Sequence, residues 1–281
     1  MPYTVERTSE NAVALRHPTV SVDWQQPYLL ISDVHWDNPH CDRALLKEHL
    51  DEAVRREAGI LVFGDFFCAM QGKYDKRADK SALRPEHQAT NYLDALVDTA
   101  ATWLEPYSKN IVMLADGNHE TAIRKHLETD LLERLCQKLN VLHMGYSGYV
   151  RFLFEQSGGS RRISKTLYWH HGSGGGGPVT KGVIQHARRA ASVEADIYVT
   201  GHIHEAWQLE NPVMRLSANG IERIDQQHHV QCATYKQEYT PGGGFHVERG
   251  RPPKPLGGWW LTWQLRAARV RDIRARFHRA D

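Results

Sequence analysis

Aspartate, asparagine and histidine gather at five separate points along this 281-residue chain. Residues of these types supply the oxygen and nitrogen ligands that divalent metal ions take in proteins. Two metal ions held close together also need a shared anion between them. The candidate ligands, in chain order, are Asp33, His35, Asp65, Asn118, one of the neighbouring His170 and His171, His202 and His204. The set predicts a two-metal centre, which could polarise a bound oxygen group and activate water.

Two of these groups leave a gap of one residue between their members: Asp33-Val34-His35 and His202-Ile203-His204. Alternate residues of an extended chain point to the same side, so each pair is expected to aim two ligands in one direction. Either pair alone is weak evidence, because a single histidine is usually a packed or surface residue. Five such groups in order favour a metal site over chance.

A short apolar run precedes every polar group, which predicts that the ligands lie at strand ends. The strands are expected at residues 28–32, 60–63, 111–114, 165–169 and 197–200. Apolar residues at helical spacing predict helices at residues 45–57, 91–104, 121–139 and 181–191. This alternation is typical of an α/β fold. Beyond residue 205 the pattern predicts further strands and a C-terminal hairpin, with Arg274 and Arg276 on its solvated face.

The bulk composition is that of an ordinary globular protein, with 41% hydrophobic and 24% charged residues. The length fits one large domain over residues 1–281 better than two average ones. A net charge of +2 does not by itself indicate a nucleic-acid partner. The four cysteines form no CxxC pair, and no apolar run is long enough to cross a bilayer. A cytoplasmic protein with reduced thiols is therefore expected.

The ordered series DVH at 33, GD at 64, GNHE at 117, HHG at 170 and GHIH at 201 resembles the calcineurin-like metallophosphoesterase family. The resemblance covers roughly residues 28–204, and GNHE and GHIH are its most specific parts. It implies two packed mixed β-sheets flanked by helices, an αββα sandwich with the metals at the strand ends. The compact chain is similar to small prokaryotic or phage-type members of the family.

The resemblance also implies a role for each candidate ligand. The implied centre has a first metal held by Asp33, His35 and His204, a second held by Asn118, His171 and His202, and a bridge formed by Asp65. Manganese is the first choice of metal, with iron, zinc, nickel or magnesium as alternatives. The two metals would turn a bridging water into the hydroxide that attacks phosphorus.

Three histidines near these ligands need separate roles. His170 and His171 compete for one ligand position, and we prefer His171 because the family's ligand there is usually followed directly by glycine. His170 would then point away from the metal, and with Gly174 and Gly175 it is a candidate for substrate binding. The family's catalytic histidine follows the asparagine, which here makes it His119. It would protonate the leaving group or stabilise the transition state.

Several other features have two interpretations each. The glycine run at 174–177 is either a flexible loop or a set of N–H groups that contact phosphate. The polar segment at residues 69–87, called the polar excursion, is either an exposed loop or a segment that contacts substrate, and we favour the exposed loop. Its charged or basic residues are Lys76, Arg77, Lys80, Arg84 and His87.

The C-terminal segment from Arg251 to Asp281 has eight Lys or Arg against two Asp, a net charge of +6. This charge could attract nucleic acid, but protection of an edge strand is the better interpretation. Trp259, Trp260 and Trp263 could stack on bases, and we expect them in the core instead.

These features predict a phosphoester hydrolase, and the motifs do not fix its substrate. We favour a phosphodiester, nucleic acid included, over a monoester. A scaffold that binds partners without turnover would be expected to have lost ligands, whereas all seven positions are filled. No membrane partner is expected, and the oligomeric state stays open.

Overall fold

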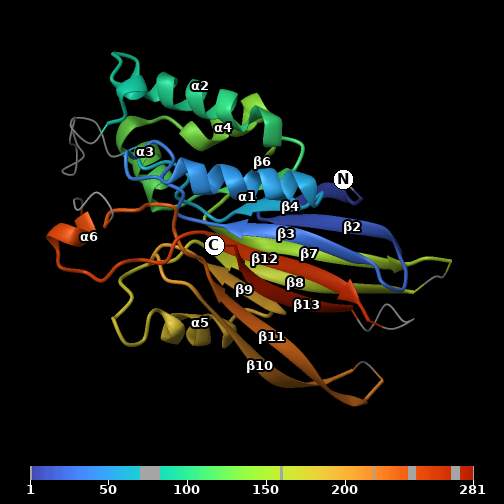
Figure 1. The fold of residues 1–281 in the computed structure, drawn as a ribbon. Helices are drawn as coiled ribbons and strands as arrows, with labels where there is room; N and C mark the ends of the chain where they lie inside the picture. The colour runs from blue at the N-terminus through green and yellow to red at the C-terminus, as the bar shows by residue number, and fades with distance from the viewer. Residues whose placement is uncertain are drawn as a thin grey trace.

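The computed structural model describes residues 2–69, 83–158, 161–217, 219–239, 245–266 and 273–280. In these ranges two mixed β-sheets pack face to face, and helices cover the outer face of each sheet (Figure 1). The predicted α/β fold with two packed mixed sheets is confirmed. None of the described helices combines the length and apolar character needed to cross a membrane.

The six-stranded sheet supplies three of the five polar groups. Its strands are β3 (Gln25–Ile31), β4 (Gly59–Val62), β5 (Ile111–Ala115), β6 (Leu142–Met144), β12 (Gly258–Leu265) and β13 (Ile273–Ala280), in the order β13-β12-β3-β4-β5-β6. Strands β3 to β6 are parallel, so their carboxyl ends meet at one edge. Asp33, Asp65 and Asn118 follow β3, β4 and β5 at that edge.

The seven-stranded sheet supplies the other two groups. Its strands are β1 (Thr4–Ser9), β2 (Ala12–Val20), β7 (Ser147–Gln156), β8 (Arg162–His170), β9 (Ile197–Thr200), β10 (Trp207–Leu216) and β11 (Glu222–Gln231), in the order β1-β2-β7-β8-β9-β11-β10. Strands β8 and β9 are parallel, and His170 pairs with Thr200 where both strands end. His171 and His202 therefore emerge from neighbouring strand ends.

The helices form a thick layer on one side of the sandwich and a thin layer on the other (Figure 1). They are α1 (Arg43–Arg55), α2 (Tyr92–Leu104), α3 (Asn118–Leu127), α4 (Leu131–Leu139), α5 (Val183–Ala190) and α6 (Phe245–Glu248), with 3₁₀ turns at Pro85–His87 and Glu105–Tyr107. Helices α1 to α4 lie over the six-stranded sheet, and α5 lies over the seven-stranded sheet (Figure 1).

The single helix predicted at residues 121–139 is wrong, because the chain forms α3 and α4 there. Glu128 ends α3 in a left-handed conformation with a φ of 52°. Asp130 then begins α4 by accepting a 2.9 Å hydrogen bond from the Glu133 amide, a typical N-cap. Helix α3 also begins earlier than predicted, so Asn118 and His119 lie in its first turn.

Alternation along the strands divides the apolar side chains between two cores. Leu30 and Leu61 lie in the core between the sheets, whereas Leu29 and Ile60 pack against the helices. The three tryptophans of β12 are at most 8% exposed, so their predicted place in the core is confirmed. The four cysteines are free and buried, as expected.

The predicted C-terminal hairpin is confirmed as β12 and β13, which pair antiparallel. Strand β13 is an edge strand, and Arg274 and Arg276 are exposed on it. This agrees with edge-strand protection as the role of their charge. The predicted segment's residues 267–272 and Asp281 lie outside the described ranges.

The polar excursion is only partly described, since Lys76, Arg77 and Lys80 fall outside the described ranges. For its two remaining basic residues the expectation of an exposed loop is wrong. The Arg84 guanidinium donates to the main-chain carbonyls of Asn38 and Cys41, at 2.9 and 2.8 Å. His87 is fully buried against Trp36, with 5.4 Å between ring centroids. Both side chains therefore have structural contacts of their own.

Candidate metal centre

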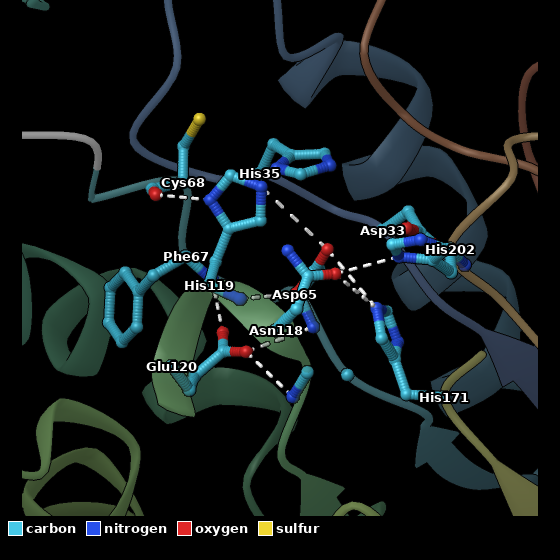
Figure 2. Close-up of polar contacts among 12 residues, drawn as sticks. Asp33, His35, Asp65, Phe67, Cys68, Asn118, His119, Glu120, His171 and His202 are labelled. Atoms are coloured by element: carbon cyan, nitrogen blue, oxygen red, sulfur yellow. Dashed lines mark hydrogen bonds and ion pairs between the residues drawn. The ribbon is translucent and has the colours of Figure 1, made fainter. Parts of the chain in front are cut away.

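The structure brings all seven candidate ligands together where the strand ends of the two sheets meet. Figure 2 shows most of these residues. The first cluster joins ligands from both sheets. Asp33 Oδ1 lies 3.2 Å from His204 Nε2, and His204 Nε2 lies 3.3 Å from His35 Nε2. These three atoms lie within 4.8 Å of one another.

The second cluster adjoins the first and has Asn118 at its centre (Figure 2). Asn118 Oδ1 lies 3.2 Å from His171 Nε2 and 2.7 Å from His202 Nδ1. Asp65 Oδ2 lies 3.2 Å from His171 Nε2. The charge of Asp65 also acts on His35 of the first cluster. Asp65 therefore acts on both clusters, and so does Asp33, whose Oδ2 accepts from the His202 amide at 2.8 Å.

The chemistry of this set fits divalent cations. Ligand atoms that share one metal at about 2.0–2.2 Å lie about 3 to 3.5 Å from each other. Four of the distances given above are 3.2 or 3.3 Å, and the fifth, from Asn118 to His202, is shorter at 2.7 Å. Asp33 and Asp65 are at most 2% exposed, and no lysine or arginine of the described ranges forms an ion pair with either carboxylate. Asp33 Oδ1 and His35 Nδ1 have no hydrogen-bond partner among the described residues. Buried charges without a fixed counter-charge favour a bound cation.

The backbone at these ligands differs from the extended geometry expected from the one-residue gaps. Five of the seven candidates have left-handed φ angles between 49° and 72°: Asp33, His35, Asp65, His202 and His204. Main-chain hydrogen bonds hold these strained conformations, among them Asp33 N to Gly64 O and His35 N to Asp65 O, both 3.0 Å. Strain of this kind costs about 1–3 kcal/mol per residue and is concentrated at functional sites.

Two glycines allow the clusters to close. A Cβ atom at Gly117 would overlap Asp65 Oδ1, and one at Gly201 would overlap Ser32 Oγ and Asp33 Oδ2. The carboxylates therefore lie directly against backbone that carries no side chain, which explains the glycine in the GNHE and GHIH motifs.

The charge state of two histidines reflects the nearby carboxylates. Burial lowers the pKa of His35, and the neighbouring His119 lowers it further, so this ring is neutral and able to bind metal. Burial alone would also lower the pKa of His171, but the Asp65 carboxylate outweighs burial and raises that pKa to about 10. The cluster therefore attracts positive charge, and a metal ion would compete with this proton.

His119 lies beside the clusters and is held by the segment that follows Asp65 (Figure 2). Its Nδ1 donates to the Cys68 carbonyl at 2.6 Å, which leaves Nε2 facing Asp65 Oδ2 at 3.9 Å. The Asp37 carboxylate, which the sequence analysis did not single out, accepts from the amides of Cys68 and Ala69 at 2.5 and 2.8 Å. Asp37 thus anchors the carbonyl that orients His119.

Glu120 is the last residue of the GNHE motif, and no role was predicted for it from the sequence. It is 3% exposed, and its carboxylate accepts from the amides of Asp65, Phe67 and Gly117 at 3.1, 2.9 and 2.8 Å (Figure 2). It therefore joins the loop after β4 to the start of α3. The glutamate at the end of GNHE, next to the predicted catalytic histidine, was the available signal.

Replacement of Glu120 by alanine is expected to lower the free energy of unfolding by about 3 kcal/mol or more, because three buried amides lose their acceptor. Urea denaturation of the metal-free protein measures this loss. Glu120→Gln keeps one acceptor oxygen and should cost clearly less. Equal stability of the alanine variant and the wild type would show that these amides have other partners.

The two neighbouring histidines occupy different surroundings. His171 is fully buried and lies in the second cluster. His170 accepts a 3.0 Å hydrogen bond at Nδ1 from the Gly172 amide. Burial, and next the charge of Arg189, lowers the pKa of His170 to about 4. Gly174 and Gly175 are exposed, and only Gln185 approaches either of them, at 3.6 Å from a Cβ built on Gly174. Their predicted contact with substrate stays a prediction.

His171→Ala is expected to empty the second metal site, whereas His170→Ala should keep both metals and most activity on a small ester. The geometry gives the reason, since only His171 faces Asn118 and Asp65. Metal analysis by mass spectrometry and hydrolysis of a chromogenic ester would measure both effects in parallel. The opposite pattern would assign the ligand to His170.

The fold and the site define an α/β sandwich protein with two adjoining clusters of candidate metal ligands at its strand ends. Residues 27–206 match the family model described as calcineurin-like phosphoesterase, and the chain belongs to that family of metal-dependent phosphoesterases. No curated protein sequence matches this one significantly.

Several solved structures are similar to this chain at low sequence identity. Vacuolar protein sorting 29 from Cryptosporidium parvum is 15% identical, with 92% of this chain and 98% of that chain covered and a TM-score of 0.38. A metallophosphoesterase from Sphaerobacter thermophilus is 14% identical, with 92% and 89% covered and a TM-score of 0.40. GAP50 of Plasmodium is 10% identical, with 92% and 85% covered and a TM-score of 0.44. The family assignment rests on the family model and not on these structures.

Proposed function

We propose that this protein is a dinuclear-metal phosphodiesterase with nuclease activity. The observation that carries the proposal is that two ligand clusters adjoin at the strand ends, each with a buried carboxylate, Asp33 in the first and Asp65 in the second. The first metal would be held by Asp33, His35 and His204, and the second by Asn118, His171 and His202, with Asp65 between them. When bound, divalent cations polarise the phosphoryl oxygens of the substrate.

The protein's own residues would then orient the ester and supply a proton. His119 Nδ1 is tied to the Cys68 carbonyl, so Nε2 is the nitrogen that can meet a leaving oxygen. Glu120 and Asp37 hold the two backbone segments that fix this ring. The role assigned to His119 is proton donation to the leaving group.

The charge near the site supports a diester over a monoester. A diester carries one negative charge at phosphorus and a monoester carries up to two. The cation that acts on His35, Lys236, is neutralised by Glu238 at 2.7 Å. Lys236 therefore adds no free positive charge beside the first cluster, so a scissile phosphate with a single negative charge is the better match.

A panel of substrates tests this proposal directly. The protein would be loaded with manganese, iron, zinc, nickel or magnesium, of which manganese is our first choice. It would then be assayed on bis-p-nitrophenyl phosphate, p-nitrophenyl phosphate, and single- and double-stranded DNA. We expect faster turnover of the diester and of DNA. Faster turnover of the monoester would overturn the diester assignment, and absence of both metal and turnover would favour a scaffold.

A further inference from the structure

A half-buried arginine lies beside the second cluster, on the outer face of the seven-stranded sheet. Arg189 belongs to the last turn of α5, and its Nη1 donates to Thr200 Oγ1 at 3.1 Å. Thr200 ends β9, two residues before His202, and it pairs with His170, the residue before His171. The guanidinium is therefore fixed at the ends of the two strands that carry the histidines of the second cluster.

The charge of Arg189 has no acidic partner in the described ranges. Burial lowers the pKa of Arg189, and electrostatic interactions with Tyr168 and Tyr146 partly offset this effect. A guanidinium has five N–H donors, and the bond to Thr200 uses one. None of the other guanidinium nitrogens is both buried and without a hydrogen-bond partner. These nitrogens are therefore open to solvent. The hydrogen bond to the Thr200 hydroxyl could be made by a neutral side chain and does not explain why a charged one is used. A charge without a partner is also costly to bury.

His170 adds a second donor next to this guanidinium. Its Nδ1 accepts from the Gly172 amide, so the proton of the neutral ring is on Nε2. Because His170 pairs with Thr200 across the two strands, its ring points to the same sheet face as the hydroxyl that holds Arg189. Tyr146 joins the pair to the metal centre, with ring centroids 5.2 Å from His170 and 5.4 Å from His171. Tyr146 also fixes the loop by donating to the Gly172 carbonyl at 2.6 Å.

We propose that Arg189 and His170 form a subsite for a second phosphate group of the substrate, beside the metals that hold the scissile one. A fork of charged N–H donors matches the geometry of phosphate oxygens, and a neutral N–H donor can complete the contact. The inference rests on the proposed phosphodiesterase function. It narrows the substrate class to esters with at least two phosphates, as in a nucleic-acid strand.

The test compares dinucleotides that differ by one phosphate. The substrates are thymidylyl-thymidine, with a single internal phosphate, and its 5′- and 3′-phosphorylated forms, all assayed with the manganese-loaded protein. The wild type should prefer a phosphorylated form in kcat/KM. In Arg189→Met this preference should fall by about 10- to 100-fold, the range for a lost charge-assisted hydrogen bond. Turnover of the unphosphorylated dinucleotide should change by less than about 2-fold. Arg189→Lys should keep part of the preference, because it retains charge without the fork.

The matched control is Arg188→Met, which removes the same charge from an exposed position on the same helix. It should leave the preference unchanged. Because the preference is a ratio measured in one preparation, partial unfolding of a variant does not imitate its loss. An equal loss on all dinucleotides in Arg189→Met would overturn the subsite and make Arg189 structural.

A further arm separates two sources of the second phosphate. A nucleoside 5′-diphosphate would be added as a competitive inhibitor. An inhibition constant that rises in Arg189→Met, with no change in dinucleotide preference, would overturn the nucleic-acid strand and assign the subsite to small nucleotides. If the wild type hydrolysed single-phosphate diesters but showed no preference, the subsite alone would fail. If it hydrolysed no ester with any metal, the phosphodiesterase function would fail as well.

Discussion

Asp65→Asn is expected to release both metal ions together. Under the proposed ligation Asp65 is the ligand that both metals share, and its replacement removes the anion that offsets the repulsion between two cations. Loss of a residue that only supports a ligand costs about 10- to 100-fold in metal affinity, so loss of the bridge should cost at least about 100-fold. Isothermal titration calorimetry measures the metal affinity of both proteins, and metal analysis measures the number of ions per chain.

A suitable control is Asp116→Asn, the same change at another buried carboxylate on this edge. Asp116 pairs with Arg124 at 2.8 Å and with His143 at 3.0 Å, away from the ligand atoms. This variant should lose stability and keep its metals. Two metals per chain and normal turnover in Asp65→Asn would show that Asp65 is not the bridge.

His119→Ala should separate catalysis from metal binding. Both metals should stay near wild-type occupancy, because His119 bonds to a carbonyl and lies 3.9 Å from Asp65. At the same time kcat should fall by about 10² to 10⁴, the usual range for loss of a general acid. Steady-state kinetics and metal analysis on one preparation give both numbers. His126→Ala, an exposed position on the same helix, should change neither.

The leaving group should determine the size of this loss. A nucleoside alkoxide leaves poorly without a proton, so DNA and dinucleotides should be affected most. A nitrophenolate needs little protonation and should be partly spared. Equal losses on both substrates would indicate stabilisation of transition-state charge instead of proton donation, and loss of metal would make His119 a ligand.

The strands that carry the site were predictable because each is a short apolar run with a polar end. Strands β1, β2, β6 and β7 were not predicted. In β2 the residues Arg16, His17 and Pro18 interrupt the apolar pattern, and only pairing with β1 and β7 makes the segment a strand. The break between α3 and α4 was missed because the apolar spacing continues across it, although Asp130 is a typical capping residue.

The residues of the candidate site could be predicted from the sequence, but their backbone conformation could not. Motif spacing selects Asp33 and His35, but their left-handed conformations depend on hydrogen bonds to the chain after β4. Asp37 and Arg189 carry no motif. Asp37 contacts Cys68, 31 residues further along the chain, and Arg189 contacts Thr200, 11 residues further along, so only the fold brings these pairs together beside the site.

Each ligand cluster draws on both sheets, with His35 and Asn118 from one and His204 and His202 from the other. Under the proposed ligation, each metal ion is a clamp across the open edge of the sandwich. Ion binding would then add to the free energy of unfolding, by about 2.7 kcal/mol when free metal is at 100 times its dissociation constant. Scarcity of metal would then shorten the lifetime of the folded chain as well as stop its catalysis. The cellular supply of metal would therefore affect how much folded protein is present.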